Sequence, residues 1–346
     1  MRRGVAALAA VLVAGGAAWA LLHRAAAPKS RVTPRAVALE VPAPVKQTHD
    51  RGDNALWLSR HWLYEAPGDA ELDELVRACE RLGITRLYFF FGPADEHGVP
   101  GWRGGGEHHP YELAQAKRLF TEVKRRAPKL KLFPWTGGIL SRDVVWTDRA
   151  RLTGWLEELA KLIDAGADGV HFNIEPVPDG DPGLIAFLEQ ARQRLGAHAH
   201  LSVAVPLFRT DGYQLPQKQR LWSFESVAEV CRHADDLSVM AYDTYQTDAA
   251  DYRRTMAEWT DGLTRLRGCE VLIGVPSYED DAAHHRPDVE RIDVALQGIN
   301  GGREPWPENL RGVAVYGSWT TDSNEWDVFD ALWRGHAPGS NDVPER

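Results

Sequence analysis

Polar side chains recur at every second position of one short stretch, Asp168-Gly-Val-His-Phe-Asn-Ile-Glu175. Helix-like segments precede and follow it, which predicts a β-strand whose side chains alternate between two faces. One face carries Val170, Phe172 and Ile174, and the other carries His171, Asn173 and Glu175. Because an unpaired buried polar group costs roughly 2–7 kcal/mol, a polar row on a buried parallel strand needs a reason. We interpret the row as an active site with Glu175 as general acid and base.

From residue 54 onward, short apolar runs alternate with amphipathic stretches, which is typical of a parallel α/β sheet. The predicted strands are 55–58, 86–91, 130–135, 168–175, 201–205, 237–242, 271–275 and 313–316. The predicted helices are 69–82, 111–126, 148–165, 183–195, 224–233, 251–266, 287–297 and 325–333. Eight such units predict a (β/α)8 TIM barrel. An open doubly wound sheet is the alternative, but no Gly-x-Gly-x-x-Gly turn follows the first strand.

The active site of a TIM barrel lies where its strands end and the following loops begin. That rule gathers a mixed set of acids and aromatic side chains: Trp135, Asn173, Glu175, Tyr242, Asp243, Tyr278, Glu279, Tyr316 and Trp319. Sugar rings stack on aromatic faces while their hydroxyls need polar partners, so the set indicates a carbohydrate site.

The ordered motifs resemble those of family-18 glycoside hydrolases, the chitinase-like group. Its strand-four pattern D-x-x-D-x-D-x-E reads Asp168-x-x-His171-x-Asn173-x-Glu175 here, with both middle carboxylates replaced. Its M-x-Y-D is matched by residues 240–243, its G-x-P-x-Y by residues 274–278, and its S-x-G-G is echoed at 135–138. The Asn-x-Glu pair also resembles family-85 endo-β-N-acetylglucosaminidases.

Both families use the 2-acetamido oxygen of the substrate as the nucleophile, so the resemblance implies substrate-assisted, retaining hydrolysis of N-acetylglucosamine-containing glycans. Glu175 would protonate the leaving oxygen, Asn173 would accept the acetamido N–H, and Tyr242 would donate to the acetamido carbonyl. Because Asn cannot neutralise a cation, a neutral oxazoline is the expected intermediate.

The remaining candidates would contact the sugar around these three. Asp243 would reach a hydroxyl, Trp319 would lie under the reacting ring, and Tyr316 and Trp135 would line the same pocket. Met240 is expected in the floor of the site. His171 lies deeper, and a hydrogen-bonded core histidine is the favoured interpretation over a substrate contact.

Two alternatives remain open. A two-carboxylate retaining glycosidase would use Glu175 as acid/base and Glu279 as nucleophile, with the carboxyls about 5–5.5 Å apart. A non-catalytic sugar-binding barrel would keep the pocket without turnover, and the His and Asn replacements are compatible with it. None of the three hypotheses requires a cofactor.

The N-terminal region differs from the rest. Arg2-Arg3 lead into an uncharged run from Gly4 to Leu22, which predicts a signal peptide or membrane anchor over residues 1–24. Residues 25–53 contain four prolines and read as a flexible linker, 54–336 as the barrel, and 337–346 as a tail. We therefore expect an exported protein in the periplasm, at the cell surface or secreted, with membrane anchoring as an option.

Composition narrows the partners. The 346 residues carry a net charge of −9 without Lys/Arg blocks, which argues against nucleic acid. The partner that the family resemblance implies is an oligo- or polysaccharide substrate. The three cysteines are expected as buried apolar residues with at most one disulfide. The pairs His108-His109 and His284-His285 lack the spacing of zinc ligands, so we expect surface loops and no metal site.

Overall fold

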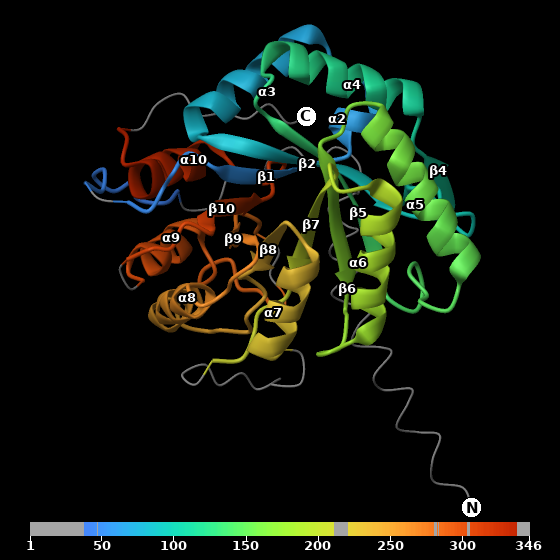
Figure 1. Ribbon diagram of the computed structural model, residues 1–346. Helices are drawn as coiled ribbons and strands as arrows, with labels where there is room; N and C mark the ends of the chain where they lie inside the picture. Colours follow the sequence, from blue (N-terminus) through green and yellow to red (C-terminus); the bar gives the residue numbers. More distant parts are fainter. Residues whose placement is uncertain are drawn as a thin grey trace, which may run out of the picture.

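A computed structural model describes residues 38–46, 48–210, 221–279, 282, 284–302 and 305–337. Eight parallel strands close into a barrel in the order β1-β10-β9-β8-β7-β6-β5-β2, which confirms the predicted TIM barrel. Helices surround the strands (Figure 1). The barrel strands are β1 Asn54–Leu58, β2 Ile84–Pro93, β5 Lys131–Ile139, β6 Gly169–Glu175, β7 His200–Val205, β8 Asp236–Met240, β9 Glu270–Pro276 and β10 Leu310–Tyr316.

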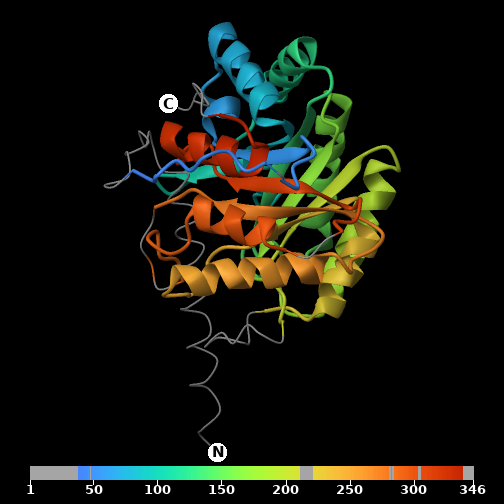
Figure 2. The same cartoon turned by 90° about the vertical axis from the view of Figure 1, so that its left-hand side faces the viewer.

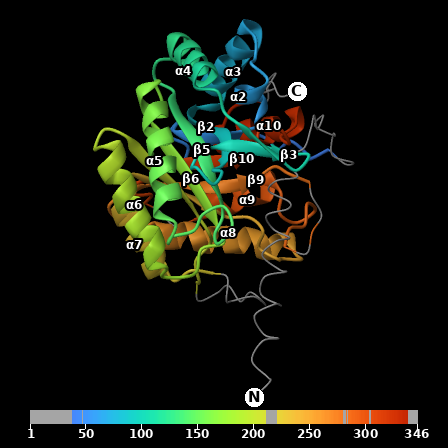
Figure 3. The same ribbon diagram turned by 90° about the vertical axis from the view of Figure 1, so that its right-hand side faces the viewer.

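The helices follow the strands in sequence. They are α2 His61–Tyr64, α3 Asp69–Leu82, α4 Leu113–Arg126, α5 Arg149–Asp164, α6 Pro182–Leu195, α7 Phe224–His233, α8 Ala249–Leu263, α9 Ile292–Asn300, α10 Ser323–Phe329 and the π-helical η2 Asp330–Arg334. Figure 3 shows α4, α5, α6 and α7 succeeding one another around the outside, and α8 and α9 lie side by side beyond them, as Figure 2 shows. None of the described helices is both long and apolar enough to cross a membrane.

Local sequence explains where several helices begin. Asp148, Asp181, Ser223 and Asp248 each accept a backbone N–H at the first turn of α5, α6, α7 and α8. Asp322 does the same for α10 as part of a capping box. The predicted start of α9 at residue 287 is wrong by five positions, because residues 287–289 form a turn before it.

The alternation predicted for β6 is confirmed. Phe172 faces outward, where its ring lies 5.7 Å from Trp155 of α5 and 5.1 Å from Phe187 of α6. His171 faces inward and stacks on Tyr88 of β2 with ring centroids 3.8 Å apart. One face of the strand therefore builds the packing under the helices, and the other lines the barrel interior.

Two parts of the chain depart from the predicted pattern. The Gly-rich loop after β2 contains an antiparallel hairpin, β3 Gly101–Gly104 with β4 Glu107–Pro110. The described part of the predicted linker lies against the barrel: Leu39 exchanges hydrogen bonds with Asn324 of α10, and Val45 donates to the carbonyl of Ala331. These residues belong to the folded unit, which corrects the inner boundary of the linker. The segment 1–24 and all but residue 337 of the tail lie outside the described residues.

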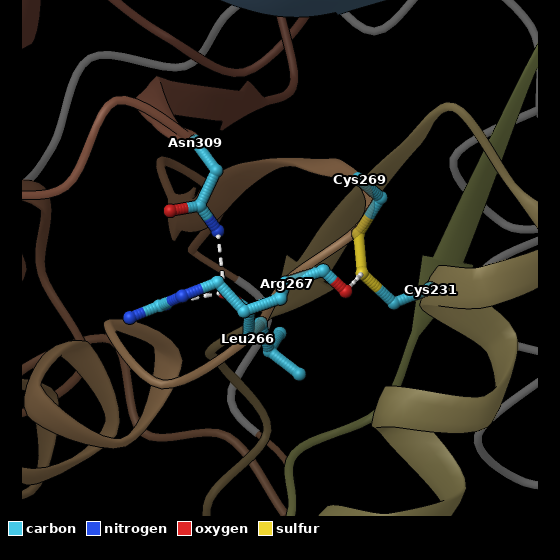
Figure 4. Close-up of a disulfide and its surroundings, with 5 residues drawn as sticks. All are labelled: Cys231, Leu266, Arg267, Cys269 and Asn309. Carbon is cyan, nitrogen blue, oxygen red and sulfur yellow. Dashed lines mark hydrogen bonds between the residues drawn. A yellow bond between two sulfur atoms is a disulfide. The ribbon is translucent and has the colours of Figure 1, made fainter.

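A disulfide joins Cys231 of α7 to Cys269, just before β9 (Figure 4). The Arg267 carbonyl lies 3.5 Å from the Cys231 sulfur, and Asn309 donates to the neighbouring Leu266 carbonyl at 3.1 Å. Cys79 is a buried free thiol, so the cysteines divide into one bridge and one buried residue.

Candidate active site

Side chains on the inner face of the barrel fall into a sealed layer and an upper layer that retains slight exposure. The sealed residues are 0–1 % exposed: Trp57, Tyr88, Phe133, His171, Leu272 and Ala314. The upper residues are 5–8 % exposed: Phe90, Trp135, Asn173, Ala204, Met240, Tyr242, Tyr316 and Trp319. We call the upper set the barrel mouth. It lies at or just beyond the carboxyl ends of the strands, where a TIM barrel holds its active site.

Glu175 ends β6 at the barrel mouth and is partly buried. Burial raises the pKa of its carboxyl to about 7, the negative charge of Asp243 adds to the rise, and a hydrogen bond with Asn173 opposes it. A carboxyl with a pKa near neutrality can both give and take a proton at neutral pH.

Asn173 lies two residues before Glu175 on the same face. Since a carboxylate only accepts, the amide nitrogen of Asn173 donates to Glu175. The Oδ1 atom of Asn173 is buried, and no described residue donates a hydrogen bond to it. An unsatisfied buried acceptor costs about 1–3 kcal/mol, so a bound N–H donor would gain by filling this position.

Tyr242 and Met240 line the mouth from β8 and the residues that follow it. The Tyr242 ring stacks on Tyr316 with centroids 5.4 Å apart, and burial, followed by nearby negative charges, raises its pKa well above the usual value. Tyr242 is therefore a neutral hydroxyl donor. Gly274 of β9 makes room for it, because a Cβ there would lie 3.1 Å from the Tyr242 ring.

Asp243 follows Tyr242 with a φ of +59°, a left-handed conformation that non-glycine residues seldom adopt. It accepts a hydrogen bond from the hydroxyl of Tyr278, at the end of β9. Its side chain is 38 % exposed, so it can reach solvent or a ligand at the mouth.

Three aromatic side chains form one wall of the mouth. The rings of Trp135 and Trp319 are nearly parallel, with an interplanar angle of 11° and centroids 6.3 Å apart, and Tyr316 meets both edge-on. Gly317 permits this arrangement, since a Cβ there would lie 2.5 Å from the Trp319 ring. The wall offers apolar faces of the type on which sugars stack.

His171 belongs to the sealed layer. Its Nε2 accepts from the Trp57 indole at 3.1 Å, and its Nδ1 lies 2.8 Å from the Ser202 hydroxyl. Burial lowers its pKa to about 3, so the ring is neutral. Both nitrogens have protein partners, and the favoured core interpretation fits the structure. His171 is therefore not placed to contact a substrate, in contrast to its inclusion among the candidate binding residues.

Two further acids considered in the sequence, Asp168 and Glu279, have surroundings that differ from those of Glu175. Asp168, the first acid of the strand-four motif, pairs with Lys124 at 2.7 Å and accepts the Leu132 N–H, at the amino end of β6. Glu279 is half-buried after β9, and the carboxylate charge that acts on Glu175 is that of Asp243.

The expectation of a surface loop is wrong for His285, which is fully buried behind Asp243. Its Nδ1 lies 3.3 Å from Glu290 Oε2 and 3.6 Å from Asp243 Oδ1, while its Nε2 donates to the Tyr278 carbonyl at 3.1 Å. No periodic pattern marks His285 or Glu290 in the sequence, because their loop is placed only by tertiary contacts.

Asp243, His285 and Glu290 form a compact cluster of titratable groups. The donor atoms of Asp243, His285 and Glu290 lie within 4.8 Å of one another. Burial lowers the pKa of His285, but Glu290 and then Asp243 outweigh it and raise the pKa overall; burial raises that of Glu290. The pair therefore shares a proton that balances part of the local negative charge.

The hairpin covers the mouth on the side of β2. Trp102 of β3 packs against the mouth cluster, stacks on His109 at 4.0 Å and has the Arg60 guanidinium 4.3 Å from its ring centroid. Both His108 and His109 lie on β4 and are partly buried, which corrects their assignment to a loop. In the sequence, the glycines of this segment indicate a loop and give no sign of the hairpin.

A second charged cluster fills the amino-terminal end of the barrel. Buried Arg86 of β2 contacts Asp236 at 2.7 Å, Glu270 at 2.5 Å and Asp53 at 3.2 Å. His200 also lies 2.7 Å from Asp236. With Arg86 already inside, the cluster of His200, Asp236 and Glu270 has no need of a cation.

Comparison with solved structures supports the fold. The chain is 13 % identical to the spore cortex-lytic enzyme SleL of Bacillus megaterium, with a TM-score of 0.53, over 84 % of this chain and 76 % of that one. The C-terminal domain of Legionella pneumophila ChiA is 14 % identical, with a TM-score of 0.52, over 81 % and 97 %. The GH18 chitinase ChiB of Flavobacterium johnsoniae is 13 % identical, with a TM-score of 0.50, over 82 % and 93 %.

No family model and no curated protein matches the sequence. At these identities the likeness extends to the barrel fold and not to the chemistry.

Proposed function

We propose that the protein is a glycoside hydrolase that acts on N-acetylglucosamine-containing glycans with assistance from the 2-acetamido group of the substrate. The observation that carries the proposal is the pairing of Glu175, whose pKa is raised to about 7, with Asn173, whose buried Oδ1 receives no hydrogen bond from the residues that the structure describes. The barrels of a GH18 chitinase, of ChiA and of the spore cortex-lytic enzyme SleL, to which this fold is similar, support the substrate class.

In the proposed first step, the protonated Glu175 carboxyl donates to the glycosidic oxygen as the bond to the anomeric carbon breaks. The acetamido oxygen attacks that carbon, and the acetamido N–H donates to Asn173 Oδ1. Because Asn173 accepts the hydrogen bond but cannot take the proton, the resulting ring keeps its N–H and is an oxazolinium rather than the expected neutral oxazoline. In the second step, the Glu175 carboxylate takes a proton from water as the water oxygen attacks the anomeric carbon, which opens the ring with retention and restores the acetamido group.

Positioning is the role of the remaining mouth residues. Tyr242 would donate its hydroxyl proton to the acetamido oxygen and orient it below the anomeric carbon. Asp243 would accept from a sugar hydroxyl, and Met240 would close the floor. Trp319 would carry the reacting ring, with Tyr316 and Trp135 beside it.

The acetamido route accounts for the site better than a carboxylate nucleophile does. A second carboxylate about 5 Å away would strongly raise the pKa of Glu175, and the acid that contributes to that rise is Asp243, not Glu279. A sugar-binding protein without turnover would have no use for a proton donor tuned to neutrality.

Export remains part of the proposal. The apolar run of residues 4–22 follows two arginines, and the Cys231–Cys269 bridge fits an oxidising compartment such as the periplasm or the cell exterior.

Hydrolysis of a matched glycoside panel tests the function. Wild type should cleave oligomers and aryl glycosides of N-acetylglucosamine and leave the corresponding glucosides intact. The Glu175→Gln variant should lose about 10²–10⁴-fold in kcat. The Glu279→Gln variant is the matched control and should retain wild-type activity.

Three results contradict the proposal in different ways. Cleavage of glucosides and loss of activity in Glu279→Gln would favour the two-carboxylate enzyme. Binding of N-acetylglucosamine oligomers by wild type with no turnover would favour the sugar-binding protein. Full activity in Glu175→Gln would remove Glu175 from the chemistry.

A further inference from the structure

After burial, the negative charge of Asp243 is the second contribution that raises the pKa of Glu175. Asn173, two positions before Glu175 on β6, is neutral, so the charge that acts on Glu175 comes from another part of the barrel, the residues that follow β8. For that charge to act consistently, the carboxylate must keep a fixed distance from Glu175, although its side chain is 38 % exposed and follows a left-handed backbone residue. Something other than the Asp243 backbone must therefore hold it.

Three side chains from beyond β9 surround the far side of this carboxylate. The Tyr278 hydroxyl donates to Asp243 Oδ1, and His285 Nδ1 lies 3.6 Å from the same oxygen. The His285 ring stacks on the Tyr278 ring, with centroids 4.0 Å apart, and donates from Nε2 to the Tyr278 carbonyl. His285 thus fixes both the ring and the backbone of the residue that binds Asp243.

Glu290 completes the arrangement from the loop before α9. Its Oε2 faces His285 Nδ1 at 3.3 Å, and its Oε1 accepts from the N–H and hydroxyl of Thr244 at 3.0 and 2.9 Å. Thr244 directly follows Asp243 in the chain. Glu290 therefore connects the backbone beside Asp243 to the histidine that holds its side chain.

We propose that Tyr278, His285 and Glu290 form a clamp that fixes the Asp243 carboxylate beside Glu175, so that Asp243 supplies the charge that β6 lacks at Asn173. These are positioning residues, since they act through Asp243. The proposal rests on the proposed function for its purpose, while its physical content concerns the ionisation of Glu175 alone.

Other groups face the same pair of acids and have to be considered with it. They are Tyr242 and Tyr316 at the mouth, and His284, whose Nε2 lies 4.0 Å from Asp243 Oδ2. Burial raises the pKa of Tyr242 well above the usual value, so it stays neutral in the range where Glu175 titrates. His284 can also affect the Asp243 carboxylate, and a His284 variant measures that contribution separately.

The test is a carbon-13 NMR titration of the Glu175 side chain in protein labelled at glutamate carboxyls, with the signal assigned by its loss in Glu175→Gln. Asp243→Asn should move the Glu175 midpoint down by about one pH unit, because it removes the nearby charge. Tyr278→Phe and His285→Gln should move it in the same direction by a smaller amount. The double variant Asp243→Asn/His285→Gln should titrate like Asp243→Asn, since the clamp acts only through that carboxylate.

His61→Gln is the matched control. His61 also lies 3.3 Å from a glutamate, Glu65, but belongs to α2. It should leave the Glu175 midpoint unchanged, and His284→Gln measures the share of the adjacent histidine. Tyr278→Phe keeps the ring and removes only the hydroxyl, so it tests the clamp even where His285→Gln unfolds.

A wild-type midpoint in both Tyr278→Phe and His285→Gln would overturn the clamp. So would a double variant that shifts further than Asp243→Asn. The titration needs no substrate, so the clamp and the proposed function fail separately. Expected shifts without glycan hydrolysis would retain the clamp and reject the function; hydrolysis that depends on Glu175 with unchanged midpoints would do the reverse.

Discussion

An acid lies inside each end of this barrel, and among the described residues only the one at the amino-terminal end has a cation beside it. At the amino-terminal end, Asp236 contacts Arg86 and His200, and these partners outweigh burial, so its pKa falls to about 2. At the mouth, Glu175 has Asp243 and Asn173 as neighbours, and its pKa rises to about 7. The two ends show that a neighbouring cation, more than depth, decides whether a buried carboxyl in this fold is a permanent charge or a proton carrier.

The largest expected effect comes from removing the cation. Arg86→Met leaves Asp236 charged and buried, so we expect a loss of roughly 3–5 kcal/mol in the free energy of unfolding. Urea denaturation at pH 7 measures it. Arg126→Met is the control, because Arg126 also contacts three carboxylates but the network is largely exposed. That variant should lose at most about 1 kcal/mol.

At the mouth, removal of the ionisable group is expected to increase the free energy of unfolding rather than decrease it. The folded pKa of Glu175 lies above its unfolded value of 4.5, so its contribution to stability is complete below pH 4.5 and is lost as the pH rises through about 7. Glu175→Gln should therefore be more stable than wild type at pH 8, on the order of 2–3 kcal/mol, and equal to it at pH 4. A variant less stable than wild type at pH 8 would contradict this assignment.

A smaller loss of stability is expected at acidic pH. Asp236 has a folded pKa below its usual 3.8, so the stability it provides is present above about pH 4 and is lost as the pH falls through about 2. The expected loss is on the order of 2 kcal/mol between pH 4 and pH 2, to which Asp53, held ionised mainly by Arg86, adds. Denaturation at a series of pH values should show this decline in wild type and a flatter one in Arg86→Met.

The smallest expected effect concerns the aromatic wall. Trp319→Ala removes one stacking face, worth about 0.5–1.5 kcal/mol beyond area burial, so affinity for N-acetylglucosamine oligomers should fall roughly 2–13-fold. Isothermal titration with Glu175→Gln as the background avoids turnover. Trp102→Ala is the comparison variant, because Trp102 belongs to the hairpin and its loss measures the contribution of the hairpin separately from that of the wall. Trp326→Ala is unsuitable, because that ring is buried in the core.

The sequence was sufficient for the barrel because strand and helix periods are local. The inward alternation of His171, Asn173 and Glu175 follows from the two-residue repeat of one strand, and the same repeat correctly separates Phe172. Capping residues such as Asp148 and Asp322 mark helix starts for the same local reason.

Loops were where the sequence failed. His285 appeared as a polar loop residue, yet Tyr278 and Glu290 enclose it through contacts that no local pattern encodes. The hairpin around Trp102 was hidden in the same way, because its glycines indicate a turn but not the ring that packs beneath it. Arg86 escaped notice because a single arginine at a strand start gives no sign of the three acids that meet it.

The closing seam of the barrel has a consequence for biosynthesis. β1 pairs with β10, so the first and last strands of the barrel must meet, and Leu39 and Val45 form hydrogen bonds with Asn324 of α10 and Ala331 of η2. One edge of β1 can pair early with β2, but the other has no partner in a nascent chain until β10, which ends at Tyr316, has left the ribosome. Until then the strands can form only an open sheet, whose two edges expose backbone groups that the closed barrel pairs.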